Sequence, residues 1–330
     1  MAELFTHTCL FENGEVTSGS GFAWEHARDS FCVSSTESSA GSTDAWEWRC
    51  ANAPDGACVA VVTDGERVVS RILGTRKQAV LDGQQVTFVE VFDLYNDFEY
   101  RHGLGRANSL KQCGEAFSKS FGGRAPESFP ILYGVPTRRA HRFGLRHLRW
   151  EILRSEARLR LRPQGHCAPA APGVEVEEIT RFPDQLDPVC AEVSASRGAM
   201  LVRDARRLNH RFCERPDSNY TIAAARKNGQ FAGYCVLADG ALVDWVCPHE
   251  SLDVASAMVV WGDERARTEG HEGLAASFPE TAPEWLIFQR FGFWIQGGMD
   301  YTVFRSFHKP YIMSWLFFNW YYTPADLGRV

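Results

Sequence analysis

Several features that would place this chain in a well-known class are missing from its 330 residues. Positive charge is not in excess, because 35 Lys and Arg stand against 41 Asp and Glu and give a formal net charge of -6. Nucleic-acid-binding proteins usually carry a basic face or stripe, so we expect no nucleic-acid partner. The most apolar stretch, 312–322, is interrupted by Ser314 and Asn319 and is too short to span a bilayer. We therefore expect no membrane partner.

Signals for secretion, metal binding and the common nucleotide folds are also missing. The N-terminus lacks the long apolar run of a signal peptide, which favours a cytoplasmic location. The ten cysteines form no CxxC pair, so we expect no metal site and reduced, mostly buried thiols. Neither the GxGxxG spacing of a Rossmann loop nor the Gly-Lys-Ser/Thr of a P-loop is present.

What the chain does contain is an ordinary globular composition and a repeated hairpin pattern. Hydrophobic residues make up 45% and charged residues 23% of the chain, and the length suggests two domains. Asp-Gly and Asn-Gly pairs favour tight hairpin turns. In the first half such pairs punctuate strand-like runs at 59–62, 68–73 and 86–95, and in the second half at 221–225, 231–237 and 241–246. Each set predicts an antiparallel meander.

A second motif follows each meander. Arg142-Phe143-Gly144-Leu145 precedes a strand-like segment at 148–153, and Arg290-Phe291-Gly292-Phe293 precedes one at 301–304. We expect a turn at both places and interpret the ordered pair of features as an internal repeat; chance remains the alternative, because such hairpins are common. A Pro/Gly-rich segment separates the halves. We therefore predict a first domain over 1–162, a linker over 163–174 and a second domain over 175–330.

The segment 101–107 follows the third predicted strand and contains two arginines, a histidine and two glycines. Behind it, apolar residues at 104, 107, 110, 113 and 117 recur with helical spacing. Free amides at a helix N-terminus attract anions, glycine permits close backbone approach, and arginine pairs with phosphate. This pattern predicts an anion site, most naturally for a diphosphate; a plain loop with a solvated basic edge is the alternative.

The order of meander, long strand, Gly-containing turn and helix resembles the GNAT acyltransferases. In that family a Gln/Arg-x-x-Gly-x-Gly/Ala turn binds the CoA pyrophosphate, and Gly103 and Gly105 match its glycines. Tyr100 stands where Gln or Arg is expected, and Arg101 would substitute after a shift of one residue. The segment 133–136, followed by Arg142-Phe143-Gly144-Leu145, resembles the family's fifth strand, fourth helix and the turn into the sixth strand. The tail at 319–326 resembles the ending of bacterial tandem GNAT proteins.

The resemblance implies an α+β fold with two GNAT-like domains, each a mixed, mostly antiparallel twisted sheet flanked by helices. It also implies transfer of an acetyl group from acetyl-CoA, or of another acyl group from its CoA thioester, to the amine of a small molecule or amino acid. The second domain lacks the turn and is degenerate. The implied CoA-binding residues are Leu94, Tyr95, Arg101, His102, Gly103, Leu104, Gly105, Arg106 and Ala107. In this scheme the backbone of Leu94 and Tyr95 pairs with the pantetheine arm.

Three residues are candidates for the chemistry. Glu90 shares the expected strand face with Phe92 and Leu94 and would act as base, directly or through water; a strand carboxylate in solvent or in a salt bridge is the alternative. Asp93 is expected on the opposite face, as a site or network residue or as a loop contact. Tyr133, at the end of the fifth strand, is the candidate acid, with a buried aromatic anchor as the alternative.

Two other functions remain open. One is a non-catalytic GNAT-like binding protein, which the departure at Tyr100 allows. The other is a FemABX-type transferase, which also has tandem GNAT folds but uses aminoacyl-tRNA. The negative net charge counts against the second, because a tRNA-binding surface is usually basic.

Overall fold

The computed structural model describes residues 4–34, 42–100, 108–163, 165, 168, 171–216, 219–298 and 300–328. The chain forms two compact units. Unit 1 comprises Met1–Gln78, Val86–Ile152 and Val303–Met313, and unit 2 comprises Ala79–Gln85, Leu153–Thr302 and Ser314–Val330. These units are built from interleaved segments. The predicted domains, 1–162 and 175–330, divide the chain by sequence order alone, and this division stays a prediction.

The first sheet has the strand order β2-β1-β3-β4-β5-β6-β16-β7. Its strands are β1 (Leu4–Glu12), β2 (Glu15–Gly19), β3 (Ala57–Asp64), β4 (Arg67–Leu81), β5 (Gln84–Asn96), β6 (Ile131–Gly134), β7 (Glu151–Ser155) and β16 (Tyr301–Ser306). The hairpins at its start are antiparallel, whereas β5 and β6 run parallel.

The second sheet has the order β15-β8-β14-β13-β12-β11-β9. Its strands are β8 (Arg158–Leu161), β9 (Val174–Ile179), β11 (Thr221–Lys227), β12 (Gln230–Ala238), β13 (Ala241–Val246), β14 (Ala275–Ala276) and β15 (Phe293–Gln296). Here β13 and β14 are the parallel pair. Two short strands, β10 (Ala199–Leu201) and β17 (Trp320–Tyr321), pair with each other, and β10 also pairs with residues 79–81 of β4 within unit 2.

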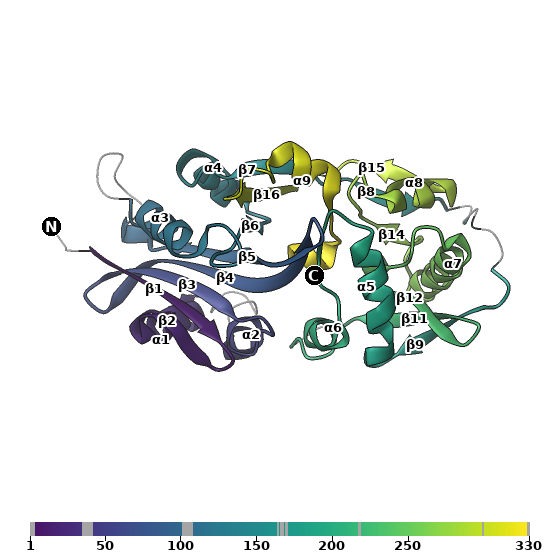
Figure 1. Ribbon diagram of the computed structural model, residues 1–330, viewed down its shortest axis with the longest axis horizontal. Helices are drawn as coiled ribbons and strands as arrows, with labels where there is room; N and C mark the ends of the chain where they lie inside the picture. The colour runs from purple at the N-terminus through teal and green to yellow at the C-terminus, as the bar shows by residue number, and fades with distance from the viewer. Residues whose placement is uncertain are drawn as a thin grey trace. The chain divides into compact units, whose positions relative to one another are not determined.

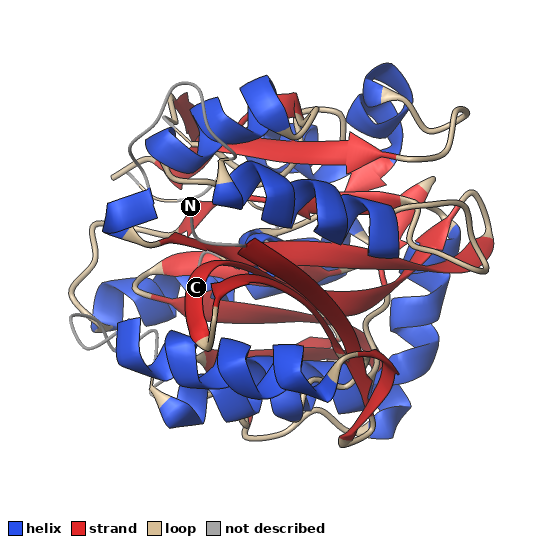
Figure 2. Ribbon diagram, turned by 90° about the vertical axis from the view of Figure 1, so that its left-hand side faces the viewer, coloured by secondary structure: helices blue, strands red, loops and turns tan. Residues whose placement is uncertain are grey.

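Helices cover both faces of the sheet in unit 1. These helices are α1 (Gly21–Ser34), α2 (Thr43–Trp46), the π-helical turn η2 (Glu47–Ala51), α3 (Ser109–Phe121) and α4 (Arg138–His147). Figure 1 shows α1 and α2 on one side of β1 and β3 and α3 on the other, and Figure 2, which faces unit 1, shows its twisted strands between helices. One apolar cluster lies under α1 and α2 around Trp46, and another lies under α3 around Phe117.

Unit 2 is arranged in the same way. Its helices are α5 (Asp187–Ala195), α6 (Ala205–Phe212), α7 (Leu252–Thr268), α8 (Pro283–Arg290) and α9 (Met313–Asn319). Trp245 on β13 and Phe288 on α8 lie in its apolar core with ring centroids 5.1 Å apart. The predicted α+β class, with two mixed sheets flanked by helices, is confirmed. Of the described helices, none combines the length and the apolar character that crossing a membrane requires.

Both predicted meanders are present. The turns that follow β4, β11 and β12 place Asp82, Asn228 and Asp239 at φ values of 52°, 54° and 48°. Positive φ is the conformation that Asp, Asn and Gly tolerate best, which is why these dipeptides identified the turns. The described cysteines are free, and most of them are buried. Burial raises the pKa of the Cys9 and Cys190 thiols to about 12.

The prediction of a turn at the repeated Arg-Phe-Gly motif is half correct. In unit 2, α8 ends at Arg290 and β15 begins at Phe293, as expected. In unit 1 the prediction is wrong, because 142–145 lies inside α4, which continues to His147. The basic last turn of α4 favours the helix C-terminus electrostatically. The chain turns only afterwards, where Arg149 adopts a φ of 55°.

The two halves of the sequence exchange one strand each. β16, from the second half, lies between β6 and β7 in the first sheet, and β8, from the first half, lies between β14 and β15 in the second. β15, which the sequence analysis did not predict, takes the place in its sheet that β7 takes in the other. The segments 148–153 and 301–304 are therefore not equivalent copies, since β7 is an edge strand and β16 an interior one.

Candidate active site

The parallel strands β5 and β6 separate part-way along their length. Their ladder pairs 88–90 with 131–133, after which β5 continues to Asn96 without pairing to β6. Gly134, the last residue of β6, lies close to β5, because a Cβ built on it would be 2.5 Å from the Val91 carbonyl oxygen. The end of the ladder leaves backbone groups of β5 beyond Glu90 without a partner in β6. Such groups can bind an extended ligand or an oxyanion.

The alternation of β5 shifts by one residue at this point. Phe92 faces η2, where its ring lies 4.0 Å from the Arg49 guanidinium. Asp93 faces the same side, because it contacts Arg71, which stacks on Phe31 of α1. Leu94 packs in the opposite cluster, under α3. Two consecutive residues on one face are the signature of a β-bulge, so the predicted placement of Asp93 opposite Glu90, and of Leu94 with Glu90, is wrong.

Glu90 and Tyr133 are brought together. They are direct partners in the last pair of the parallel ladder, so both side chains lie on the same face of the sheet. Tyr133 is completely buried, with its ring edge-to-face to Phe88 at 6.5 Å between centroids. Glu90 is also buried, and its Oε1 accepts a hydrogen bond of 3.0 Å from Arg49 while Lys77 Nζ lies 3.8 Å from its Oε2. The salt-bridge alternative for Glu90 therefore describes its contacts in this structure.

Asp93 belongs to a second charged group on that face. Arg71 Nε donates to its carboxylate at 2.7 Å, and Arg71 Nη1 donates to Ser30 of α1 at 2.7 Å. The Arg71 guanidinium also lies over the Tyr95 ring, 4.6 Å from the centroid. Burial raises the pKa of the Tyr95 phenol, and nearby Asp97 raises it further. A buried arginine thus fixes both Asp93 and Tyr95 near the end of β5.

The sequence analysis did not identify the three cations on this face: Arg49, Arg71 and Lys77. Arg71 and Lys77 interrupt the apolar pattern of β4, and a buried charge costs free energy unless it is paired. The same argument applies to Asp93 and to Arg71, which are paired with each other. Arg49 gave no signal, because it lies in a π-helical turn that no local pattern predicts.

The predicted diphosphate segment, Arg101, His102, Gly103, Leu104, Gly105, Arg106 and Ala107, lies outside the described residues. Its neighbours are described. The Tyr100 hydroxyl hydrogen-bonds Asp64 of β3, which raises the pKa of the phenol, so Tyr100 is held against the β3–β4 hairpin. After the segment, Asn108 caps α3 by accepting a hydrogen bond from the Lys111 amide. The segment therefore joins the free end of β5 to the N-terminus of α3.

Unit 2 has the corresponding strand pair, but charged side chains bind to its β13 strand beyond the pairing. β13 and β14 pair only at Ala241 and Ala275 before they separate. Beyond this point Asp244 is fully buried and accepts hydrogen bonds from Tyr234 and Thr323, each of 2.8 Å, and from Arg203. Arg203 also binds Asp326 in the C-terminal turn η5 (Pro324–Leu327) at 2.6 Å. Burial opposes the charge on Asp244, but Arg203 holds its pKa below the ordinary value.

The turn after β13 also differs. It runs from Cys247 through Pro248 to Ser251 and contains no glycine, in agreement with the sequence analysis. Its charged side chain Glu250 is exposed, and Asp253 lies in the first turn of α7. Two carboxylates at a helix N-terminus disfavour a diphosphate there. The turn after β13 therefore does not offer an anion site of the kind predicted for residues 101–107.

No family model matches this sequence, and no curated protein matches it in sequence. Solved structures match it in fold. A GCN5-related N-acetyltransferase from Anabaena variabilis has a TM-score of 0.64 at 12% identity, over 93% of this chain and 74% of that one. A probable N-acyltransferase from Enterococcus faecalis has a TM-score of 0.62 at 12% identity, over 96% and 74%. A tandem GNAT protein from the clavulanic acid biosynthesis pathway has a TM-score of 0.51 at 15% identity, over 93% and 99%.

These likenesses agree with the arrangement of the two sheets. Each unit has an antiparallel meander, helices on both faces and one pair of parallel strands that separate. These pairs are β5 and β6 in unit 1 and β13 and β14 in unit 2. The chain therefore has the fold of the GCN5-related N-acetyltransferases, present twice in tandem.

Proposed function

We propose that this protein is an acyl-CoA-dependent N-acyltransferase whose reaction takes place in unit 1, with acetyl-CoA as the acyl donor and a small-molecule amine or amino acid as the acceptor. The observation that carries the proposal is the separation of β5 from β6 immediately after Glu90 and Tyr133. It combines free strand backbone, a bulge and two buried polar side chains at one point, and the strand then leads to the N-terminus of α3.

The reaction is a direct transfer. The neutral amine nitrogen attacks the thioester carbonyl carbon, the C–N bond forms, the C–S bond breaks, and CoA leaves as a thiolate. The amine loses a proton in the process, and the thiolate gains one. A backbone N–H of β5 beyond the ladder stabilises the negative charge on the carbonyl oxygen. Leu94 and Tyr95 offer strand backbone to the pantetheine arm, and residues 101–107 offer amides and guanidinium groups to the diphosphate.

Glu90 and Tyr133 are the residues to be tested for the two proton transfers. Because Glu90 is bound by Arg49 and faces Lys77, we assign it proton acceptance through a water rather than by direct contact. Tyr133 would protonate the thiolate. Asp93, bound by Arg71, is assigned to positioning of the bulge.

The test is acetyl-CoA binding followed by turnover. Binding should raise the melting temperature, and a panel of amines and amino acids should release CoA thiol. We expect Gly103→Glu and Arg106→Glu each to weaken acetyl-CoA binding by about 100-fold, because each places a carboxylate beside the diphosphate. The matched control is His249→Glu in the turn after β13, which should leave binding unchanged.

Three outcomes would change the assignment. Binding without thiol release from any acceptor would favour the non-catalytic binding protein. Unchanged binding in both unit 1 variants, with circular dichroism showing intact folds, would remove the segment 101–107 from the site. An equal loss in His249→Glu would show that net charge alone was responsible.

A further inference from the structure

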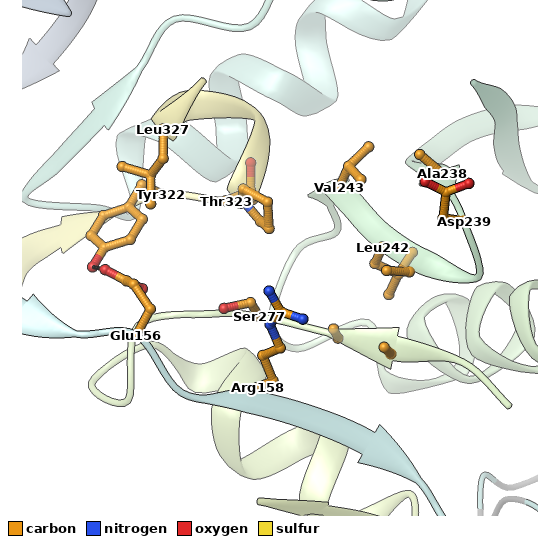
Figure 3. A pocket seen from close by; sticks show the side chains of 14 residues that line it. Glu156, Arg158, Ala238, Asp239, Leu242, Val243, Ser277, Tyr322, Thr323 and Leu327 are labelled. Carbon is orange, nitrogen blue, oxygen red and sulfur yellow. Dashed lines mark hydrogen bonds between the residues drawn. The ribbon is translucent and has the colours of Figure 1, made fainter. Parts of the chain in front are cut away.

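Unit 2 contains a cavity of about 280 Å³ at the point where β13 separates from β14. This volume is close to the lower end of the range of roughly 300–1,000 Å³ that small-molecule pockets span. One wall is β13 with Leu242 and Val243, and another is β14 with Ala276 and the following Ser277. The C-terminal segment closes it with Tyr322 and Leu327 (Figure 3). Most of these walls are apolar.

The polar groups around the cavity differ in whether they already have hydrogen-bond partners in the protein. The carboxylate of Glu156 accepts hydrogen bonds from the hydroxyls of Tyr322, at 2.8 Å, and Thr302. The Thr323 hydroxyl donates to Asp244, and the Ser277 hydroxyl donates to the Ala157 carbonyl. These groups hold the cavity together and are committed to protein partners.

Arg158 is different. Arg158 is an exposed residue. Within the described part of the chain its guanidinium has neither a hydrogen bond nor an ion pair, and Figure 3 shows it directed into the cavity beside Ser277. The other unbound charge, Asp239, lies in the exposed β12–β13 turn and on the far side of the cavity in this view. A guanidinium above apolar walls matches a ligand with a carboxylate at one end and a short hydrocarbon group at the other.

We propose that unit 2 binds a small aliphatic carboxylate in this cavity, with Arg158 on the carboxylate and the hydrocarbon against Leu242, Val243 and Leu327. This site is separate from the proposed acyl transfer in unit 1. The cavity lies where β13 and β14 separate, and the turn after β13 has no segment like 101–107 that could bind a diphosphate. Success or failure of either proposal leaves the other standing.

The experiment is calorimetric titration of the full-length protein with sodium butyrate and sodium hexanoate, and with 1-butanol and butylamine as probes of similar size. We expect butyrate to bind with a Kd of about 1 mM. The affinity should rise roughly fourfold for each added methylene until the cavity is full. The alcohol and the amine should bind at least about tenfold more weakly, because neither can form the charged pair with Arg158.

Three variants test the location. Arg158→Gln removes the charge but keeps a polar side chain with part of the methylene stem, and should weaken butyrate binding by about tenfold or more. Arg160→Gln makes the same charge change two residues along β8, where the side chain pairs with exposed Glu272, and should change nothing. Ala238→Leu, at the partly exposed rim, should abolish binding by filling the cavity, with an unchanged melting temperature as evidence of folding.

The proposal is overturned if no carboxylate binds at tens of millimolar, or if 1-butanol binds as tightly as butyrate. Equal weakening by Arg158→Gln and Arg160→Gln would also overturn it, because the effect would then come from general surface charge. Retention of binding in Ala238→Leu would place the ligand elsewhere.

Discussion

The acid–arginine pairs of the two units differ in their exposure to solvent. In unit 1, Arg49 and Glu90 have side-chain exposures of 26% and 4%, and Arg71 and Asp93 have 2% and 22%. In unit 2, Arg203 and Asp244 have 3% and 2%, and Arg197 and Glu284 have 7% and 3%. Each pair in unit 1 thus keeps one member in reach of solvent, whereas the pairs in unit 2 are enclosed. The two copies of the fold therefore differ in how far their acid–arginine pairs are exposed to solvent.

The largest expected effect is a difference in stability between variants of Asp244 in unit 2 and Asp93 in unit 1. Asp244→Ala leaves Arg203 buried with only Asp326 as a charged partner, and we expect the free energy of unfolding to fall by about 3–5 kcal/mol. Asp93→Ala also removes the acid partner of a buried arginine, Arg71, but Asp93 is 22% exposed, so water can take the place of its carboxylate. We therefore expect this change to cost only about 1–2 kcal/mol. Urea unfolding of both variants measures the difference. Equal losses would contradict the comparison, and Asp244→Asn provides a folded alternative if the alanine variant does not accumulate.

A second test compares the two glutamates. Glu90→Gln preserves shape but removes proton acceptance, and we expect kcat to fall by about 100-fold while acetyl-CoA binding is retained. Glu284→Gln makes the same change in the enclosed pair of unit 2 and should affect the melting temperature but not kcat. If both variants kept full kcat, Glu90 would have only the structural role that its salt bridge shows.

The smallest effect concerns the contact at the end of β6. Gly134→Ala places a methyl carbon 2.5 Å from the Val91 carbonyl oxygen unless the strands move, and such overpacking costs about 1–3 kcal/mol. We expect a loss near the lower end of this range, because β6 ends at this residue, together with a raised KM for acetyl-CoA. Ala276→Gly, at the end of the corresponding strand β14, should leave that KM unchanged. A Gly134→Ala enzyme with normal KM would show that the spacing of β5 and β6 does not set acyl-CoA binding.

The sequence predicted the features that depend on neighbouring residues. The turns at Asp82, Asn228 and Asp239 and the strands around them were found because positive φ and strand alternation are local properties. The helix over 109–121 was found because Cys113 and Phe117 repeat with its period and are buried. The family resemblance added the α+β class and the tandem arrangement.

Features set by distant contacts could not be predicted. The bulge between Phe92 and Asp93 depends on contacts with α1, η2 and α3, so simple alternation placed Asp93 on the wrong face. The helical position of Gly144 depends on how far α4 extends. The exchange of β8 and β16 left no trace in the pattern of either strand, because alternation shows which face a strand buries but not which sheet it joins.

The exchange of strands also determines when the first sheet can complete its folding during synthesis. The place between β6 and β7 in the first sheet is filled only by β16, so it stays vacant until residue 306 has left the ribosome. At ~5–20 residues per second, the roughly 150 residues between β7 and β16 take about 8–30 s to synthesise. Throughout that interval one edge of β6 is unpaired and β7 has no neighbouring strand in the sheet. The first sheet therefore cannot reach its final form before the last part of the chain is synthesised.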